Sequence, residues 1–348
     1  MSGMVVLTGW PDECHDILLR VAGQVPDELL HRLRTWLAAG EARPLAGSLA
    51  FAARAYRLPL TVHDAALLVD LVTGDGGYLP EFALTEPHLT EPDLDCPYEF
   101  LPVAPDEVPA GTRVPSSLDG TSAAAPALTE LDAAAVVVAG AQPGLHGLWR
   151  AWRLPDDDLE WPPPKRVFLV EVAARGGRHL VADRFARVLR AAGEVDPQVE
   201  VWAVDEDPPA YQMLARDGAA LLWAARPPGQ LRTAGFDLAP DPARTLSDGQ
   251  QRRGMLRFLA AGHLLLTTDA LAEDTVRPER GAVVPVDVRT DGSWIWTDAI
   301  AYHLREYAIA PDPDLLAHAQ AAGYHCPPVD TVTAFRAMVA LDQAAEPS

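Results

Sequence analysis

The sequence predicts a mixed α/β or α+β protein with a helical region at its N-terminus, a partly parallel sheet covered by helices, and a C-terminal hairpin. Three patterns indicate this fold class: apolar residues three and four positions apart through the first 74 residues, alternating strands and helices from residue 166 onward, and a strand–turn–strand pattern around residue 291. The expected regions are a helical region at 1–74, an acidic proline-rich connection at 75–164 and an α/β domain at 165–348.

Four helices are expected in the first region, because each apolar stripe there is bounded by Gly or Pro. Thr61 is the expected N-cap of the fourth helix, since its side-chain oxygen can accept a hydrogen bond from the first turn. The expected helices are Pro11–Ala22, Pro26–Ala39, Leu45–Tyr56 and Val62–Val72.

The connection carries the strongest charge asymmetry in the chain. Between Asp75 and Asp132 there are twelve acidic residues and one basic residue, Arg113, so this stretch contributes −11 of the net charge of −21. Nine prolines in the same stretch disfavour regular helices and central strands, and we expect an ordered surface loop over 80–126. After this loop we expect a helix at Leu128–Ala141, a short helix around Trp149 and Trp152, and a linker at Asp156–Pro164.

The region after the linker is predicted to form successive βα units. Its first strand is a continuous apolar run, as a parallel sheet covered on both faces requires. Right-handed crossovers are expected between parallel strands. The expected elements are strand Val167–Val172, helix His179–Ala192, strand Val199–Val204, helix Pro208–Arg216, strand Ala219–Trp223, a loop over 226–245, a helix begun by a Ser247/Gln250 capping box and ending near Ala261, and strand Leu264–Thr268.

A β-hairpin is the clearest local prediction, and we expect it at the edge of the sheet. The Asp291-Gly292 pair is a typical tight-turn sequence, and it separates the strands Val283–Thr290 and Trp294–Trp296. Three helices should follow, at Asp298–Tyr307 with Thr297 as its cap, from Asp312-Pro313 to Gly323, and from Asp330 or Thr331 onward.

Composition excludes several classes of protein. No apolar run approaches the roughly 18–20 residues that a membrane span needs, and the first ten residues lack the features of a signal peptide, so we expect a cytoplasmic protein. Three widely spaced cysteines, at 14, 96 and 326, argue against a disulfide framework or a cysteine-rich zinc site. A net charge of −21 repels phosphate backbones, so nucleic acid is not an expected partner. The oligomeric state is left open.

The loop after the first parallel strand is a candidate small-molecule site. Gly176, Gly177 and Arg178 lead into a helix there, at the place where doubly wound folds bind phosphate. A dinucleotide fingerprint needs glycine at three set positions, whereas this loop has one adjacent pair. Asp205 and Glu206 follow the next strand, at the position of a ribose-binding acid. An enzyme of unfamiliar type, with its site near 173–178 and 205–207, is the alternative functional hypothesis.

No catalytic residue, metal or cofactor is predicted. The histidines form no His-x-x-x-His pair, and no Gly-x-Ser-x-Gly motif occurs. His325 and Cys326 are adjacent, and adjacent residues seldom reach the geometry of a catalytic Cys–His pair. Carboxylates are so abundant that a glycosidase-like pair stays open as an alternative.

Trp294 and Trp296 are two positions apart on a predicted strand and therefore share one face, with Ile295 on the other. Two interpretations are open. This face packs under the following helix, through Tyr302 and Leu304, or it anchors a protein partner.

Two stretches resemble segments of uncharacterised proteins from high-GC Gram-positive bacteria. They are Asp-Pro-Gln-Val-Glu-Val-Trp at 196–202 and Thr-Asp-Gly-Ser-Trp-Ile-Trp-Thr-Asp at 290–298, with the following 302–307. Some of those proteins accompany secreted toxins, as immunity-type proteins do. The resemblance covers at most the C-terminal half, and its motifs are strand ends and a hairpin, so it implies no catalytic residue.

The leading hypothesis is a non-enzymatic acidic binding protein, an immunity-like or sequestering factor for a basic protein partner. Its acidic surface would speed association with the partner, and its aromatic residues would hold the complex together. The expected partner-binding residues are Glu91, Asp93, Asp95, Glu99, Asp106, Glu107, Trp294 and Trp296.

Overall fold

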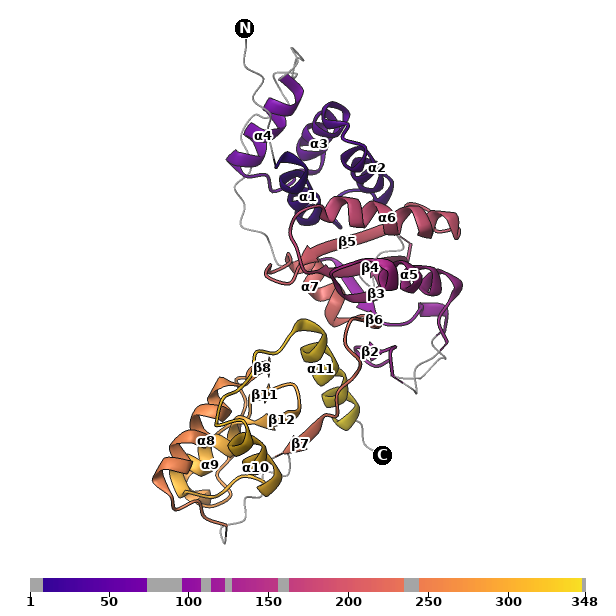
Figure 1. The fold of residues 1–348 in the computed structure, drawn as a ribbon. Helices are drawn as coiled ribbons and strands as arrows, with labels where there is room; N and C mark the ends of the chain where they lie inside the picture. Colours follow the sequence, from indigo (N-terminus) through magenta and orange to yellow (C-terminus); the bar gives the residue numbers. More distant parts are fainter. Residues whose placement is uncertain are drawn as a thin grey trace. The chain divides into compact units, whose positions relative to one another are not determined.

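A computed structural model describes residues 9–73, 96–107, 114–122, 127–155, 163–234 and 244–345 (Figure 1). The chain divides into two compact units, unit 1 at Met1–Arg226 and unit 2 at Pro227–Ser348. Helices combine with parallel and antiparallel strands, so the predicted α/β or α+β class is confirmed. Within the described ranges, no helix is long and apolar enough to cross a membrane.

Four helices open unit 1, as the periodicity predicts. Thr61 caps the fourth, since its Oγ1 accepts from the N–H of Asp64 at 3.1 Å, while the Asp64 carboxylate accepts from the N–H of Thr61 at 2.8 Å. This reciprocal pair satisfies two backbone donors that the helix leaves open. The helices are α1 (Trp10–Arg20), α2 (Asp27–Ala38), α3 (Ala42–Tyr56) and α4 (Val62–Thr73).

The main sheet of unit 1 has the strand order β2-β6-β3-β4-β5, and β1 also pairs with β3. Strands β4 and β5 are parallel, as expected, whereas β3 is antiparallel to β1, β4 and β6. The third predicted strand, β6, therefore lies beside β3 and does not continue the sheet from β5. The strands are β1 (Tyr98–Leu101), β2 (Leu118–Asp119), β3 (Leu145–Pro155), β4 (Lys165–Val172), β5 (Gln198–Ala203) and β6 (Ala220–Ala224), with a 3-10 turn at Pro105–Glu107.

The short helix expected around Trp149 and Trp152 is wrong, because both residues lie on the central strand β3. This strand pairs with β4 along most of its length and is largely buried. A strand buried on both faces lacks the apolar–polar alternation that identifies a strand from sequence. The missed strand also explains why residues of the expected acidic connection belong to the sheet of unit 1.

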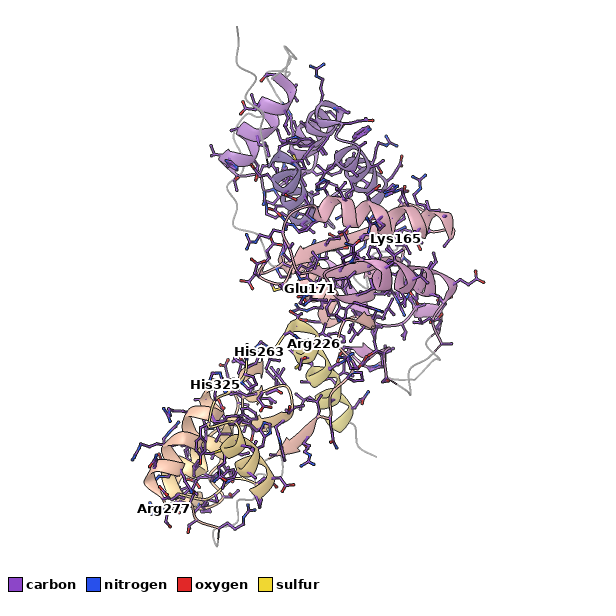
Figure 2. All side chains as sticks on the ribbon, in the orientation of Figure 1. Lys165, Glu171, Arg226, His263, Arg277 and His325 are labelled. Atoms are coloured by element: carbon purple, nitrogen blue, oxygen red, sulfur yellow. The ribbon has the colours of Figure 1, made fainter. Side chains whose placement is uncertain are left out.

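Helices α5 (Glu130–Ala141), α6 (Arg178–Ala191) and α7 (Ala210–Asp217) complete unit 1, each close to its predicted position. Residues from α5 and α6 share one core with β3, β4, β5 and β6; it includes Phe168, Phe185 and Leu189, all 0% exposed. Lys165, the single lysine of the chain, begins β4 and donates from Nζ to Glu194 at 2.9 Å (Figure 2).

The N-terminal helices pack beside α6 and β5, and Figure 1 shows α1 and α2 next to α6. Buried polar contacts join these helices to the edge strand. His15 donates from Nε2 to the carbonyl of Val201 at 2.7 Å, and Arg34 donates from Nη2 to both carboxylate oxygens of Glu200 at 2.7 Å. The compact unit therefore extends across the boundaries expected at 74/75 and 164/165.

Unit 2 contains the predicted hairpin, with two differences. Its strands β11 (Val288–Thr290) and β12 (Trp294–Thr297) pair antiparallel around the Asp291-Gly292 turn, while the residues before Asp287 form a separate strand, β10. The hairpin also belongs to a second sheet, of order β7-β12-β11-β8, and does not edge the sheet of unit 1. The remaining strands are β7 (Arg232–Ala234), β8 (His263–Leu266), β9 (Leu271–Glu273) and β10 (Ala282–Pro285). Strand β7 lies within the loop expected over 226–245, and β10 pairs with β9.

The helices of unit 2 begin close to their predicted positions. The first is capped by Asp248, whose Oδ1 accepts from the N–H groups of Gln250 and Gln251, and not by Ser247 as expected. Asp312 caps the third in the same way, through the N–H groups of Asp314 and Leu315. The helices are α8 (Gly249–Ala261), α9 (Asp298–Tyr307), α10 (Pro313–Ala321) and α11 (Thr331–Ala345), with a 3-10 turn at Pro278–Arg280.

Candidate functional site

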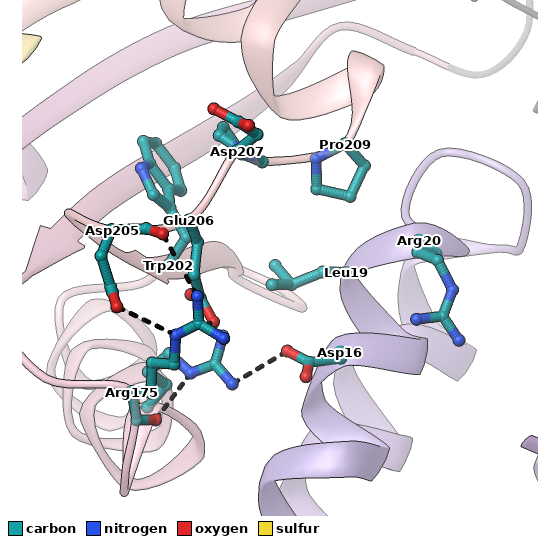
Figure 3. Close-up of a pocket in the computed structure, with 11 residues that line it drawn as sticks. Asp16, Leu19, Arg20, Arg175, Trp202, Asp205, Glu206, Asp207 and Pro209 are labelled. Atoms are coloured by element: carbon teal, nitrogen blue, oxygen red, sulfur yellow. Dashed lines mark hydrogen bonds and ion pairs between the residues drawn. The ribbon is translucent and has the colours of Figure 1, made fainter.

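A pocket of about 410 Å³ lies in unit 1, where the parallel strands β4 and β5 end (Figure 3). Its volume falls within the range of roughly 300–1,000 Å³ that small-molecule sites occupy. Three segments form its walls: the C-terminal half of α1, the β4–α6 loop, and the β5–α7 loop. The lining residues are Asp16, Leu19, Arg20, Arg175, Arg178, Trp202, Asp205, Glu206, Asp207, Pro208 and Pro209.

The pocket lies at the small-molecule position expected from sequence, and Arg178, Asp205 and Glu206 line it. Their contact with a ligand stays a prediction. Gly176 and Gly177 are not lining residues. Gly177 shapes the loop instead, because its φ of 80° at the N-cap of α6 lies in the left-handed region that favours glycine.

Sequence reasoning missed the wall that α1 contributes. Asp16, Leu19 and Arg20 come from a helix that precedes β4 by more than a hundred residues, so only packing against α6 brings them to the strand ends. One signal was present: Asp16 and Arg20 are charged and four positions apart, so they share one side of α1.

Arg178 holds the three walls together. Its side chain is almost fully buried, and Nε donates to the carbonyl of Arg175 at 2.7 Å. Nη1 donates to Oε2 of Glu206 at 2.6 Å, and Nη2 pairs with Oδ1 of Asp16 at 2.9 Å. Each nitrogen of the guanidinium therefore has an acceptor, and its charge is compensated by two carboxylates.

Arg175 and Asp205 form a more exposed pair at the pocket. Arg175 donates from Nε to Oδ2 of Asp205 and from Nη2 to its carbonyl, both at 3.2 Å. The Nε of Arg175 also lies 3.4 Å from Oε1 of Glu206. The two side chains of the Arg175–Asp205 pair are 59% and 64% exposed, so this pair contributes little to stability and remains accessible to a ligand.

The lining is acidic after these pairings are counted. Four carboxylates face three guanidiniums, and Arg20 is already bound through Nη2 to Asp64, outside the pocket, at 2.6 Å. Asp207 is exposed and forms no hydrogen bond or ion pair with the described residues. Burial raises the pKa of Asp16, because the loss of hydration outweighs the attraction of Arg178, and Glu206 raises it further.

The N-terminus of α6 is occupied by a carboxylate of the protein itself. Asp12 of α1 accepts from the N–H of Gly177 at 3.1 Å, and the same oxygen lies 3.7 Å from Nδ1 of His179. The carboxylate binds one of the backbone donors that a phosphate would otherwise use, and it places a negative charge at this helix end. The arrangement therefore argues against a nucleotide phosphate at the glycine loop.

The predicted partner-binding residues fall into three groups. Glu99 on β1 and Asp106 and Glu107 in the first 3-10 turn are exposed. Trp294 and Trp296 are only 6% and 0% exposed and pack in unit 2, so they are core residues and not exposed anchors. The remaining three, Glu91, Asp93 and Asp95, lie outside the described residues.

The packing of the hairpin follows the first of the two interpretations open from sequence. Trp294 and Trp296 share a core with Phe258 of α8 and Leu304 of α9, whereas Tyr302 belongs to a different cluster. Ile295 packs on the opposite face, as strand alternation requires.

The described residues contain no group of three His, Cys, Asp or Glu side chains placed to hold a metal ion. The thiol of Cys326, next to His325, has its pKa raised to about 11 by burial and by the nearby charge of Asp291. A protonated thiol is a poor nucleophile, so this adjacent pair has no poised thiolate at neutral pH.

Comparisons of the chain with protein-family models, with curated proteins and with solved structures gave no match.

Proposed function

We propose that unit 1 binds a small molecule and that the pocket holds a positively charged group of this ligand. The observation that supports this proposal most strongly is the uncompensated negative charge of the lining. Asp207 has no partner among the described residues, and Asp16 and Asp205 each bind an arginine through one oxygen. An ammonium or guanidinium group would compensate this charge, and a partly enclosed site strengthens the attraction.

Ligand binding is the function that the lining supports most directly. Its charged side chains are aspartate, glutamate and arginine, which bind ionic groups of opposite charge. An enzymatic version of the proposal would use Asp16, whose raised pKa suits a proton donor or acceptor.

A titration with simple cations tests the proposal. The probes are n-butylammonium and n-butylguanidinium, with uncharged n-butanol as the reference compound, and the measurement is calorimetric or NMR-detected binding. We expect both cations to bind more tightly than butanol. Asp207→Asn should weaken the binding of the cations about tenfold, the value of one charge-assisted hydrogen bond.

The matched control is Asp70→Asn, because Asp70 is an exposed aspartate of α4 that does not line the pocket. It should leave the affinity unchanged. Butanol binding as tightly as the cations, or no binding of either cation, would overturn the proposal.

The acidic surface supports a second proposal, the sequestering or immunity-like role in the cytoplasm with a basic protein as partner. The supporting observation is that Glu99, Asp106 and Glu107 are exposed in a stretch that contributes −11 to the net charge. The two buried tryptophans take no part in this version, so electrostatic attraction alone would bind the basic partner.

A further inference from the structure

The α1 wall presents two opposite charges to the pocket from adjacent turns of one helix. Asp16 and Arg20 both line the pocket and are four positions apart, so their Cβ atoms are about 6 Å apart. They do not pair with each other, because Asp16 pairs with Arg178 and Arg20 with Asp64. Asp16 uses one carboxylate oxygen and Arg20 one terminal nitrogen in these pairs, so each keeps a second atom for a group of opposite charge on a ligand.

Arg20 has an unmet donor in addition. Its Nη2 is bound to Asp64, but its Nη1 has no acceptor among the described residues, and the side chain is 35% exposed. A carboxylate on a ligand would supply an acceptor for this charged donor. This part of the lining therefore suits an anionic group, unlike the carboxylates of the other walls.

The pocket separates these groups along its length. In Figure 3, Arg20 lies on one side of Leu19, and Arg175 and Asp205 lie on the other, with Asp16 below Leu19. Leu19 and Pro209 supply apolar surface between the charged groups. A ligand that matches this order carries a carboxylate, a nearby ammonium, an aliphatic stem, and a distal cation.

We propose that the ligand is a free basic α-amino acid of the arginine or lysine type. Its carboxylate binds Arg20, its α-ammonium binds Asp16, its stem lies against Leu19, and its terminal cation binds Asp205 and Asp207. The inference rests on the proposed function, because it specifies which cation the same pocket takes.

A set of related compounds tests each contact separately. L-arginine is compared by calorimetry with agmatine, which lacks the carboxylate, and with Nα-acetyl-L-arginine, which lacks the α-ammonium. We expect agmatine and Nα-acetyl-L-arginine each to bind about tenfold more weakly than L-arginine, since each lacks one charge-assisted interaction. L-lysine should bind within about tenfold of L-arginine, because both supply a terminal cation.

Arg20→Gln provides the matching variant. The readout is the ratio of the L-arginine and agmatine affinities within the same variant. Loss of the contact between Arg20 and Asp64 would lower both affinities equally and would leave this ratio unchanged. The ratio should fall from about ten to about one. The control is Arg32→Gln, an exposed arginine of α2 paired with Glu28, which should leave the ratio unchanged.

The outcomes separate the two proposals. Agmatine binding as tightly as L-arginine, or a ratio unchanged in Arg20→Gln, overturns the amino-acid ligand while the cation pocket stands. If L-arginine, agmatine and the n-butyl cations all fail to bind, both proposals fall.

Discussion

Arg178 of α6 and Asp16 of α1 form an ion pair of 2.9 Å, although they lie in different helices far apart in the sequence. The same guanidinium binds Glu206 at 2.6 Å and so joins α1 to the loop after β5. This contact positions the helical wall of the pocket against the strand ends, and it links the stability of unit 1 to the shape of the site.

Replacing Arg178 with methionine should destabilise unit 1. The substitution keeps most of the volume but leaves Asp16 without its cation, and it leaves Glu206, which is 15% exposed, with only the longer contact to Arg175. Breaking a buried ion pair on one side costs about 3 kcal/mol of the free energy of unfolding. Urea denaturation measures the loss, and hydrogen exchange should show faster exchange in α1.

The control for this change is Arg187→Met on the same helix. Arg187 pairs with Asp183 across one turn and is 73% exposed, so its loss should cost about 0.5 kcal/mol or less. Equal effects of the two substitutions would show that Arg178 does not hold the walls together.

His15 should make the protein less stable as the pH falls. Burial lowers its pKa from 6.5 to about 3, so between these values the unfolded chain binds a proton that the folded protein does not. The stability that the neutral imidazole contributes is present above pH 6.5 and falls by up to about 1.4 kcal/mol per pH unit below it.

His15→Gln removes this titration and retains a donor for the carbonyl of Val201. Urea midpoints of the variant should therefore change less between pH 6.5 and pH 4 than those of the wild type. Parallel curves for the two proteins would contradict the assignment of this pH dependence to His15.

Asp16 should show the opposite dependence. Its pKa is raised above 3.8, so the folded protein favours the protonated carboxyl, and the contribution to stability is lost as the pH rises through the folded pKa. Asp16→Asn does not titrate. The difference in stability between the variant and the wild type should therefore shift in favour of the variant as the pH rises above about 4, and the variant should bind L-arginine more weakly. Denaturation and calorimetry measure the two effects on the same sample. A variant that loses stability relative to the wild type over this range would contradict it.

Gly262→Ala should destabilise unit 2. A Cβ at this position would lie 2.3 Å from Cζ2 of the buried Trp296, and a rigid indole cannot move without disturbing the core. Overpacking of this kind costs about 1–3 kcal/mol. Gly47→Ala in α3 is the control, because a Cβ there meets nothing within 4 Å; in a helix it should raise stability by up to about 1 kcal/mol.

The acidic-surface proposal has its own test, with a polyarginine peptide as the basic probe. Neutralising Glu99, Asp106 and Glu107 together, as Gln, Asn and Gln, should slow association and flatten its dependence on salt. Unchanged association kinetics would contradict the role of these exposed carboxylates.

The sequence determined most of the local structure. Helices α1 to α4 could be predicted because their apolar stripes are regular and their ends are marked by Gly, Pro or a capping residue such as Thr61. The hairpin at Asp291-Gly292 was predictable because turn geometry depends on the residues of the turn itself. The acidic charge of residues 75–132 is likewise a property of composition alone.

The pairing of the strands and the walls of the pocket depend on tertiary contacts. Strand β3 was missed because a strand buried on both faces has no alternating pattern, and its place between β4 and β6 depends on pairing across long separations. The strand ends near Arg178 and Glu206 could be placed from sequence, since parallel strands end on one edge of a sheet. The α1 wall could not be placed, because Asp16 and Arg20 reach that edge only when α1 packs beside α6, and their spacing within α1 does not indicate which element the helix packs against.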